Sequence, residues 1–132
     1  MGILPDKKTR VLVIEDNQDM LDIYRHMFSD EPGYRVEFTS DAMMGLGMLE
    51  KESFDLIVLD IVMEPLSGES FFVYLRGNEK TMKVPVVVVS VLDPSSLTAL
   101  EKLNHTIILQ KPVRKEDLFG AFEKFRTLYG RA

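Results

Sequence analysis

Short apolar runs and amphipathic segments alternate along the chain from Arg10 onward. A continuous apolar run, such as RVLVIE over 10–15, is typical of a strand covered on both faces. Alternating apolar and polar positions, as in YRVEFT over 34–39, indicate a half-exposed edge strand. The run VPVVVVSV over 84–91 is too apolar for an edge. The pattern predicts strands over 10–15, 34–39, 54–60, 84–91 and 105–110.

The segments between these strands have the periodicity of amphipathic helices, with turn signals such as Pro32-Gly33 between elements. The predicted helices cover 17–30, 41–51, Ser67 to about Glu79, Pro94–Asn104, and Lys115 to about Tyr129. The predicted buried face of the first helix is Met20, Ile23, Tyr24 and Met27. That of the last helix is Leu118, Ala121, Phe122, Phe125 and Leu128. Core packing is also predicted for Met43, Met44 and Met48.

This alternation predicts an α/β fold in which right-handed crossovers place helices on both faces of a parallel sheet. For five βα units the common arrangement is the doubly wound, flavodoxin-like, three-layer α/β/α fold with strand order 2-1-3-4-5. Such sheets bind ligands outside the carboxyl ends of the strands, here between strands 1 and 3. The 132 residues are predicted to form an N-terminal tail over 1–9 and one domain over 10–130. A closed eight-unit barrel would need a much longer chain.

Composition narrows the class of function. The net charge is −5, and the lysines and arginines are scattered rather than gathered in a stripe, which argues against direct nucleic-acid binding by this chain. Cysteine is absent, so the chain can form neither disulfides nor thiolate metal sites. No apolar run approaches the ~20 residues of a membrane span, and the N-terminus lacks a signal-peptide pattern. These features favour a cytoplasmic protein that does not enter a membrane.

Polar residues follow four of the predicted strands at the point where each strand ends. Glu15 and Asp16 follow the first strand, and Asp60 ends the third. Ser90 ends the fourth strand, and Lys111 follows the fifth. Because the carboxyl ends of parallel strands meet at one edge of the sheet, we expect these side chains to gather there. A lone serine or lysine at a strand end often contacts only backbone or solvent, so the interpretation depends on the whole set.

Three carboxylates packed together repel one another, by roughly 4 kcal/mol per pair at ~4 Å and an effective dielectric near ~20. A hard divalent cation removes this repulsion, and Mg²⁺ favours a few carboxylates together with water and phosphate oxygens. Lys111 would add positive charge and Ser90 a hydroxyl donor, an arrangement that suits an incoming phosphoryl group. Asp60 is then predicted to be the nucleophile that forms an acyl phosphate.

From about Arg10 to Tyr129 the chain resembles the response-regulator receiver domains of two-component signal transduction. The resemblance lies in the motifs VLVIEDN, DLIVLDIVM followed by Gly68, VPVVVVS and LQKP, which occur in the order and with the spacing typical of that family. Each motif is weak alone, whereas their combination is highly specific.

The resemblance implies a phosphoacceptor in a phosphorelay. Asp60 would accept its phosphoryl group from a sensor histidine kinase or a histidine phosphotransfer protein. Asp16, Asp60 and the backbone carbonyl of Val62 would ligate Mg²⁺, while Glu15 would act largely through water. Receivers catalyse only their own Mg²⁺-dependent phosphoryl transfer and slow dephosphorylation, so we expect no turnover of another substrate.

The resemblance also implies how the signal leaves the site. Ser90 would follow the phosphate as the conformational switch, and Lys111 would contact the phosphate directly. The Lys111-Pro112 peptide bond is expected to be cis. The face formed by the fourth helix, fifth strand and fifth helix would bind a downstream partner or a second copy. Phe119 lies about 100° off the main stripe of the last helix and is predicted to be exposed on that face.

Two features depart from the family pattern. Glu64 stands where the family usually has proline, with Pro65 one place later, while Gly68 keeps its usual position. We interpret this as a reshaped loop rather than a lost site. Ile108 replaces the aromatic residue that normally precedes the lysine by three positions, so any output signal is expected to travel differently.

Two other functions fit parts of the sequence. Glu64 and Ile108 motivate a pseudo-receiver, an interaction module that signals without phosphate. A Mg²⁺-dependent phosphatase with an aspartyl nucleophile, of the haloacid-dehalogenase type, would carry a second aspartate two residues after the nucleophile. Val62 occupies that position and cannot donate a proton.

Val62 and Leu92 also bear on how long a phosphorylated Asp60 persists. Val62 lies two positions after Asp60, and Leu92 lies two positions after Ser90. Neither side chain can form a hydrogen bond with a hydrolytic water. We expect a phosphorylated state that lasts for many minutes or more. The sequence stops shortly after Tyr129, which suits either a stand-alone regulator or a receiver cut from a larger protein.

Overall fold

The computed structural model describes residues 8–60, 68–90 and 105–129. The elements in chain order are β1 Thr9–Ile14, α1 Gln18–Phe28, β2 Tyr34–Thr39, α2 Ala42–Lys51, β3 Leu56–Asp60, α3 Gly68–Gly77, β4 Val86–Ser90, β5 Thr106–Gln110 and α5 Lys115–Tyr129. The first and last residues of each element lie within two residues of the predicted ones. The helix predicted over 94–104 and the cap predicted at Ser67 lie outside the described residues. No helix in the described part of the chain is both long and apolar enough to cross a membrane.

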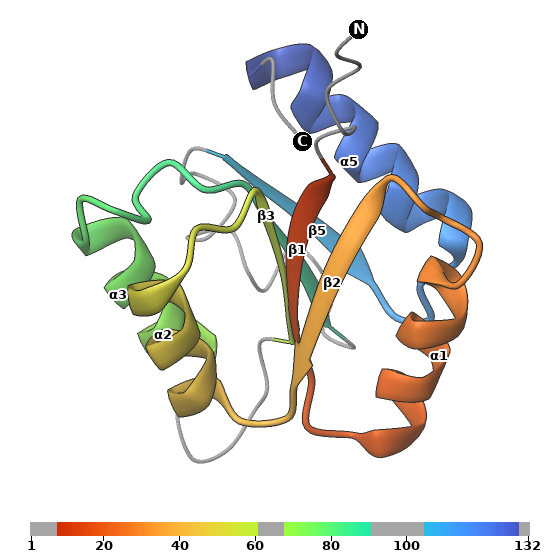
Figure 1. Ribbon diagram of the computed structural model, residues 1–132, viewed down its shortest axis with the longest axis horizontal. Coiled ribbons are helices and arrows are strands. Elements are labelled where there is room, and N and C mark those ends of the chain that lie inside the picture. Colours follow the sequence, from red (N-terminus) through yellow and green to blue (C-terminus); the bar gives the residue numbers. More distant parts are fainter. Residues whose placement is uncertain (1–7, 61–67, 91–104, 130–132) are drawn as a thin grey trace, which may run out of the picture.

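The described strands form one parallel sheet in the order β2-β1-β3-β4-β5, which confirms the predicted topology. Figure 1 shows α2 and α3 on one face of this sheet and α1 and α5 on the other, the expected three layers. β2 is an edge strand of intermediate exposure, as its alternating pattern predicts. β4 lies between two neighbours and all of its residues are buried.

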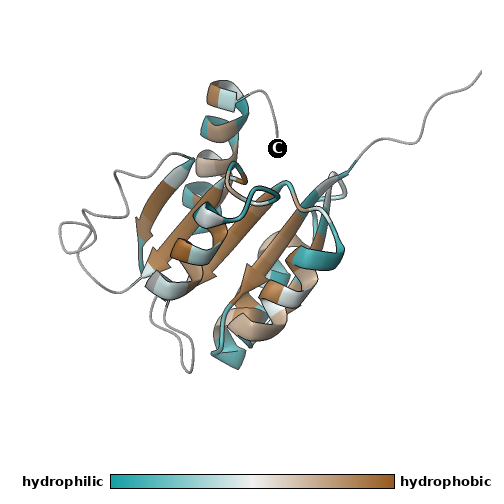
Figure 2. Ribbon diagram, turned by 90° about the vertical axis from the view of Figure 1, so that its left-hand side faces the viewer, coloured by the Kyte–Doolittle hydropathy of each residue, from teal (hydrophilic) through white to brown (hydrophobic). Residues whose placement is uncertain are grey.

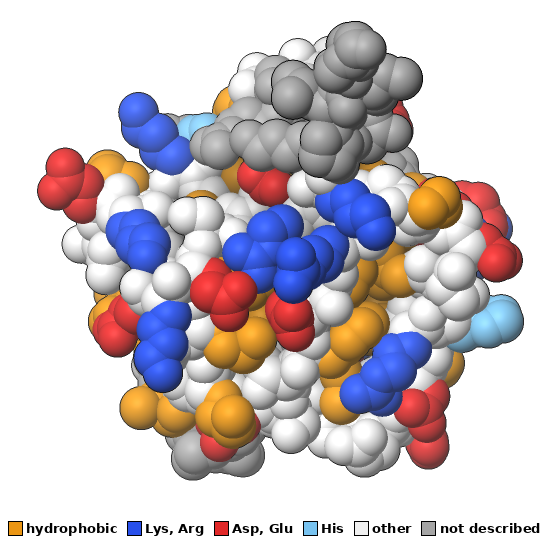
Figure 3. All heavy atoms as spheres, viewed as in Figure 1, with side chains coloured by type: hydrophobic (Ala, Val, Ile, Leu, Met, Phe, Trp, Pro, Cys, Tyr) orange, Lys and Arg blue, Asp and Glu red, His pale blue; other side chains and the backbone are white. Residues whose placement is uncertain are grey.

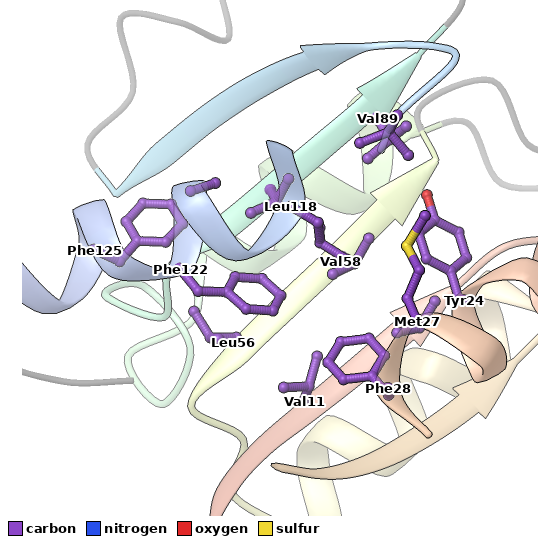
Figure 4. Packing of buried hydrophobic residues seen from close by; sticks show 14 of the residues in the cluster. Val11, Tyr24, Met27, Phe28, Leu56, Val58, Val89, Leu118, Phe122 and Phe125 are labelled. Carbon is purple, nitrogen blue, oxygen red and sulfur yellow. The ribbon is translucent and has the colours of Figure 1, made fainter. Parts of the chain in front are cut away.

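The core consists of two apolar clusters, one on each face of the sheet. Successive side chains of a strand point to opposite faces of the sheet, so alternate residues of each strand belong to different clusters. Leu12 and Val88 lie in the cluster on the α2–α3 side, and Val11 and Val87 lie in the cluster on the α1–α5 side. Figure 2 shows the central strands as mostly hydrophobic, and Figure 4 shows the second cluster between α5 and α1.

The buried face of α1 differs from the prediction. Its buried residues are Leu21, Tyr24, Met27 and Phe28. Ile23 is 45% exposed, so its predicted place in the core is wrong. Both sets have helical spacing, and Figure 4 shows the reason for the choice between them: Phe28 and Met27 face the residues of β1 and α5, which fixes the rotation of the helix.

Three other predicted core residues are exposed. Met43 and Met44 are 56% and 63% exposed, because the stripe of α2 that meets the sheet is Ala42, Gly45 and Leu49. Met48 packs against the core as predicted. Leu128 is 61% exposed, in the last turn of α5, which Figure 1 shows reaching past the start of β1.

Gly45 permits a close approach between α2 and β1. A Cβ atom at this position would lie 2.7 Å from Cδ1 and 3.3 Å from Cγ1 of Ile14, whereas a Cβ at Gly47 would meet nothing within 4 Å. Ile14 is the last residue of β1 and directly precedes Glu15. The glycine that weakens α2 as a helix therefore lets it pack tightly beside the carboxyl end of the sheet.

Candidate functional site

Strand register brings the predicted site residues to one edge of the sheet. Ile14 pairs with Leu59, so Glu15 follows β1 at the level where β3 ends with Asp60. Ser90 is the last residue of β4 and pairs with Gln110, and Lys111 follows directly after β5. The prediction that these chain positions share the carboxyl edge is confirmed by the backbone.

Glu15 is the buried acid of this edge, with 1% of the residue exposed. Its backbone N–H donates to the Thr39 carbonyl at 3.0 Å, which holds it beside the end of β2. Its carboxylate Oε2 accepts from the backbone N–H of Asn17 at 3.3 Å, and Oε1 lies 3.4 Å from Lys111 Nζ. Asp16, the next residue, is exposed. The two acids thus have different surroundings, one held within the protein and one open to solvent.

Lys111 crosses the carboxyl edge of the sheet. Its backbone N–H donates to the Ser90 carbonyl at 2.7 Å, and its peptide bond to Pro112 is cis, as expected. β3 and β4 lie between β1 and β5, so a lysine that follows β5 pairs with Glu15 only by reaching over the ends of those two strands. At about 4.8 Å per strand the separation is roughly 14 Å, and the ion pair therefore spans the region where Asp60 and Ser90 end their strands.

Ser90 is also buried, with 1% of the residue exposed. The side chain of Asp60 and all of Val62, Glu64 and Leu92 lie outside the described part, so their predicted roles stay predictions. Among the residues whose side chains the structure describes, no three His, Asp or Glu side chains are grouped to hold a metal ion. The predicted ligand set draws on Asp60 and Val62, so this finding does not test it.

Asn17 and Thr39 are contacts of the site that sequence reasoning did not assign. Asn17 is the N-cap of α1: its side-chain Oδ1 accepts from Met20 N–H at 2.9 Å, while its own N–H contacts Glu15. An asparagine just before an amphipathic segment is a recognisable cap signal. The carbonyl contact of Thr39 carries no such signal, because any residue at the end of β2 could supply it.

Phe119 does not lie where it was predicted. It is half-buried, and its ring centroid is 5.2 Å from that of Phe28, 5.3 Å from Tyr34 and 5.3 Å from Phe122. These contacts point toward α1 and β2, the edge of the sheet opposite β5. The prediction of an exposed Phe119 on the face shared with β5 is wrong, because the aromatic side chains of α1 and β2 cover that side of α5.

Charge on the surface is mixed. Figure 3 shows lysine and arginine side chains interspersed with aspartate and glutamate over the face that it presents. Exposed ion pairs of the described residues include Arg25 with Asp22 at 3.1 Å and Arg126 with Glu123 at 2.5 Å. This face matches the scattered charge expected from the sequence.

The model of one protein family, described as the response regulator receiver domain, matches residues 11–123. The chain belongs to this family. Receiver domains are signalling domains of two-component systems, as the sequence resemblance implied.

Curated relatives of this receiver are longer proteins. Transcription factor SKN7 of Candida albicans is 26% identical over 121 residues, which is 92% of this chain and 21% of that protein. The uncharacterized transcriptional regulatory protein YclJ of Bacillus subtilis is 30% identical over 87 residues, or 66% of this chain and 37% of that protein. The receiver thus spans between a fifth and two fifths of these relatives.

Solved structures share the fold of this receiver. Chemotaxis response regulator CheY4 of Vibrio cholerae has a TM-score of 0.81 at 24% identity, covering 89% of this chain and 98% of that one. The receiver domain of sensor histidine kinase PA1611 from Pseudomonas aeruginosa, solved with a magnesium ion coordinated in its active site cleft, has a TM-score of 0.77 at 23% identity. The match covers 89% of this chain and 96% of that domain.

Proposed function

We propose that this receiver is a phosphoacceptor switch in which Asp60 takes a phosphoryl group in a Mg²⁺-dependent step. The observation that carries the proposal is the ion pair between Lys111 and Glu15, 3.4 Å apart, which reaches over the end of β3. The acid follows β1 and the cation follows β5, strands that lie on opposite sides of the strand that ends in Asp60. Phosphoryl transfer needs positioned charge of this kind more than it needs covalent chemistry from the protein.

The oxygen donors at this edge suit Mg²⁺, which prefers carboxylates, carbonyls and water. In the proposal Asp16, Asp60 and the carbonyl of Val62 hold the ion, and Glu15 acts through water. The ion would neutralise charge on the carboxylates and on the incoming phosphoryl oxygens. Glu15 suits an outer role, because its two carboxylate oxygens already contact Lys111 and Asn17. The magnesium in the cleft of the PA1611 receiver supports the choice of ion.

Lys111 and Ser90 would respond to the phosphoryl group. The contact of Lys111 with Glu15 is long for a charge-assisted hydrogen bond, whose usual length is about 2.7–2.9 Å, and the lysine side chain is 18% exposed. We therefore expect Lys111 to leave Glu15 for the phosphoryl oxygens with little cost. Ser90, buried beside the backbone of Lys111, would supply its hydroxyl and carry the change into the sheet.

The proposed phosphodonor is a sensor histidine kinase or a histidine phosphotransfer protein in the cytoplasm. Transcription factors among the relatives indicate one kind of output that a longer protein with this receiver would have. The output surface predicted from the family, the fourth helix with β5 and α5, falls partly outside the described residues. Its β5 carries the half-buried Ile108 packed against the α2–α3 core cluster, where the family pattern has an aromatic side chain.

The test is phosphorylation by a small phosphodonor. With Mg²⁺ and acetyl phosphate, the intact mass is expected to rise by one phosphoryl group, and Asp60→Asn to abolish the gain. Asp55→Asn is a matched control, because Asp55 precedes the same strand at its opposite end and accepts a hydrogen bond from Arg10 N–H at 2.9 Å. Labelling should survive in the control, and a native protein that never labels would refute the proposal.

A second candidate function is that of a pseudo-receiver, which Ile108 and Glu64 favour. A Mg²⁺ titration separates the two, since the phosphoacceptor requires the ion to bind and the pseudo-receiver does not. If the protein labels, the lifetime tests the roles of Val62 and Leu92. We expect the isolated receiver to keep its phosphoryl group for many minutes, and a decay within seconds would contradict those roles.

A further inference from the structure

His105 begins the approach to β5 in a conformation that L-residues rarely adopt. Its φ is 63°, and it is the only non-glycine residue of the described chain with a positive φ. Its carbonyl accepts from Val86 N–H at 2.8 Å and from Arg76 Nη2 at 3.0 Å. A backbone held in a sparsely populated region persists only where its surroundings fix it. Here β4 and α3 fix it.

The ring of His105 stacks on the last residue of α5. Its centroid lies 3.9 Å from that of Tyr129, with 25° between the ring planes. The neighbouring residues 126–128 are exposed, and Arg126 hydrogen-bonds to Tyr34 of β2. The stack is a second attachment of the final turn of α5 to the sheet, and this attachment depends on the state of a single histidine.

The surroundings of His105 favour the neutral imidazole. Its Nδ1 is buried and has no hydrogen-bond partner among the described residues. In the described part of the chain, the charged groups that face it are two cations, Arg76 from α3 and Lys83 from the turn before β4. Burial, followed by the charges of Arg76 and Lys83, lowers the pKa of His105 below its usual range.

We propose that the stack of His105 on Tyr129 is an acid-sensitive latch that holds the C-terminal turn of α5 against the start of β5. Protonation puts an N–H on the buried Nδ1, which faces no acceptor among the residues that the structure describes, and a positive charge beside Arg76 and Lys83. The imidazolium is therefore more stable when the ring turns out to water, and the stack is lost. The latch is a property of the fold and does not depend on phosphorylation of Asp60.

The direction of the pH dependence follows from linkage. A free histidine has a pKa of about 6.5, and the latched one a lower value. The latch is at full strength above about pH 6.5 and weakens as pH falls toward the lower pKa of the latched ring. Its equilibrium constant should fall by about tenfold for each unit by which latching lowers that pKa.

The chain contains two histidines, which makes a matched experiment available. Amide hydrogen exchange of residues 126–129, corrected for intrinsic rates, is measured by NMR between about pH 7.5 and about pH 5, and both histidine rings are titrated in the same samples. Protection of this turn is expected to fall in step with protonation of His105. His26→Asn, at an exposed position on α1, should keep the step. His105→Asn should remove it, because asparagine tolerates positive φ and does not titrate in this range.

Tyr129→Leu provides a second variant should His105→Asn not fold. It keeps the histidine but removes the ring beneath it, so the final turn should be poorly protected at every pH. The pKa of His105 should then rise toward about 6.5, the value of a free histidine. The proposal is overturned if the pH step persists in His105→Asn or Tyr129→Leu, or if His105 becomes protonated in the native protein while protection of 126–129 stays constant.

Discussion

Two charged side chains, the buried Glu15 and the half-buried Arg76, lie at opposite ends of the sheet and are held in different ways. Glu15, at the carboxyl end, has a 3.4 Å contact with a lysine side chain and a 3.3 Å contact with one backbone N–H. Arg76, at the amino ends of β4 and β5, donates to four backbone carbonyls at 2.8 to 3.3 Å, and its guanidinium lies 5.0 Å from the Phe72 ring centroid.

The difference indicates which end can change. The partners of Arg76 are main-chain groups of two strand approaches, and they cannot leave without moving the fold. Burial lowers the pKa of Arg76 to about 10, so the side chain is still charged at neutral pH. One partner of Glu15 is a lysine whose side chain is 18% exposed and which, in the proposed switch, turns to another anion. We propose that the amino end is a fixed frame and the carboxyl end an exchangeable site.

The largest expected effect comes from removing the fixed charge. Arg76→Met removes the side-chain donor shared by four backbone carbonyls, three of them in part-buried hydrogen bonds, and a buried polar group left unsatisfied costs about 1–3 kcal/mol. We expect the free energy of unfolding, measured by urea denaturation, to fall by about 3 kcal/mol or more. Arg25→Met is the control, since this exposed arginine should lose less than about 1 kcal/mol. Equal losses for the two variants would contradict the fixed-frame interpretation.

The exchangeable charge should behave in the opposite manner. Glu15→Gln keeps the shape of the side chain and removes the negative charge beside Lys111, whose side chain is 18% exposed. We expect the free energy of unfolding to change by less than about 1 kcal/mol, well below the about 3–5 kcal/mol of a fully buried pair. Removal of an outer partner of a metal site typically weakens metal binding about 10–100-fold. Calorimetric Mg²⁺ titration should show a loss of that size, and an unchanged affinity would remove Glu15 from the site.

The backbone of the site could be predicted from the sequence, because parallel βα units bring all carboxyl strand ends to one edge. The ion pair of Glu15 with Lys111 could not be predicted from this rule alone. It depends on how far a lysine reaches across β3 and β4, which no local pattern encodes. The cap at Asn17 had a readable signal, whereas the Thr39 carbonyl had none.

Helix faces were harder to predict than helix positions. On α1, two overlapping stripes share Tyr24 and Met27, and only the place of the sheet and α5 selects the one with Leu21 and Phe28. On α5 the predicted bounds agree with the structure, but the predicted exposure of two side chains does not. Leu128 is exposed rather than buried, and Phe119 packs against α1 and β2 rather than facing solvent. The periodicity of a helix defines an apolar stripe. The neighbouring elements decide which side chains next to that stripe, and which turns of the helix, are buried in the core.

A smaller effect is expected where α2 packs beside Glu15. Gly45→Ala would place a methyl group 2.7 Å from Ile14 Cδ1, and overpacking a core costs about 1–3 kcal/mol. Gly47→Ala has open space and should gain up to about 1 kcal/mol of stability from helix propensity. Urea denaturation of both checks the signs. Ile14→Val, which lacks Cδ1, should rescue Gly45→Ala, and failure of the rescue would argue against this contact.

The smallest effect concerns an exposed charge at the start of α5. Arg114 donates to Asp117 through its backbone N–H at 3.1 Å and through its side chain, and the side-chain hydrogen bond is the main reason that the pKa of Asp117 is lowered. Its stabilising effect should be present above the pKa of a free aspartate, about 3.9, and lost as pH falls through the lower folded value. Asp117→Asn should lower stability by a small, constant amount at neutral pH and flatten its pH dependence in that acid range. An acid-range slope equal to that of the native protein would contradict this assignment.

The exchangeable site is tested most directly by locating the phosphoryl group. After labelling with acetyl phosphate, borohydride reduction converts an aspartyl phosphate to homoserine, which peptide sequencing can place. We predict homoserine at position 60 when Mg²⁺ is present and no conversion when it is chelated. Conversion at Asp16 or Asp55, or at position 60 without regard to Mg²⁺, would contradict the proposed chemistry.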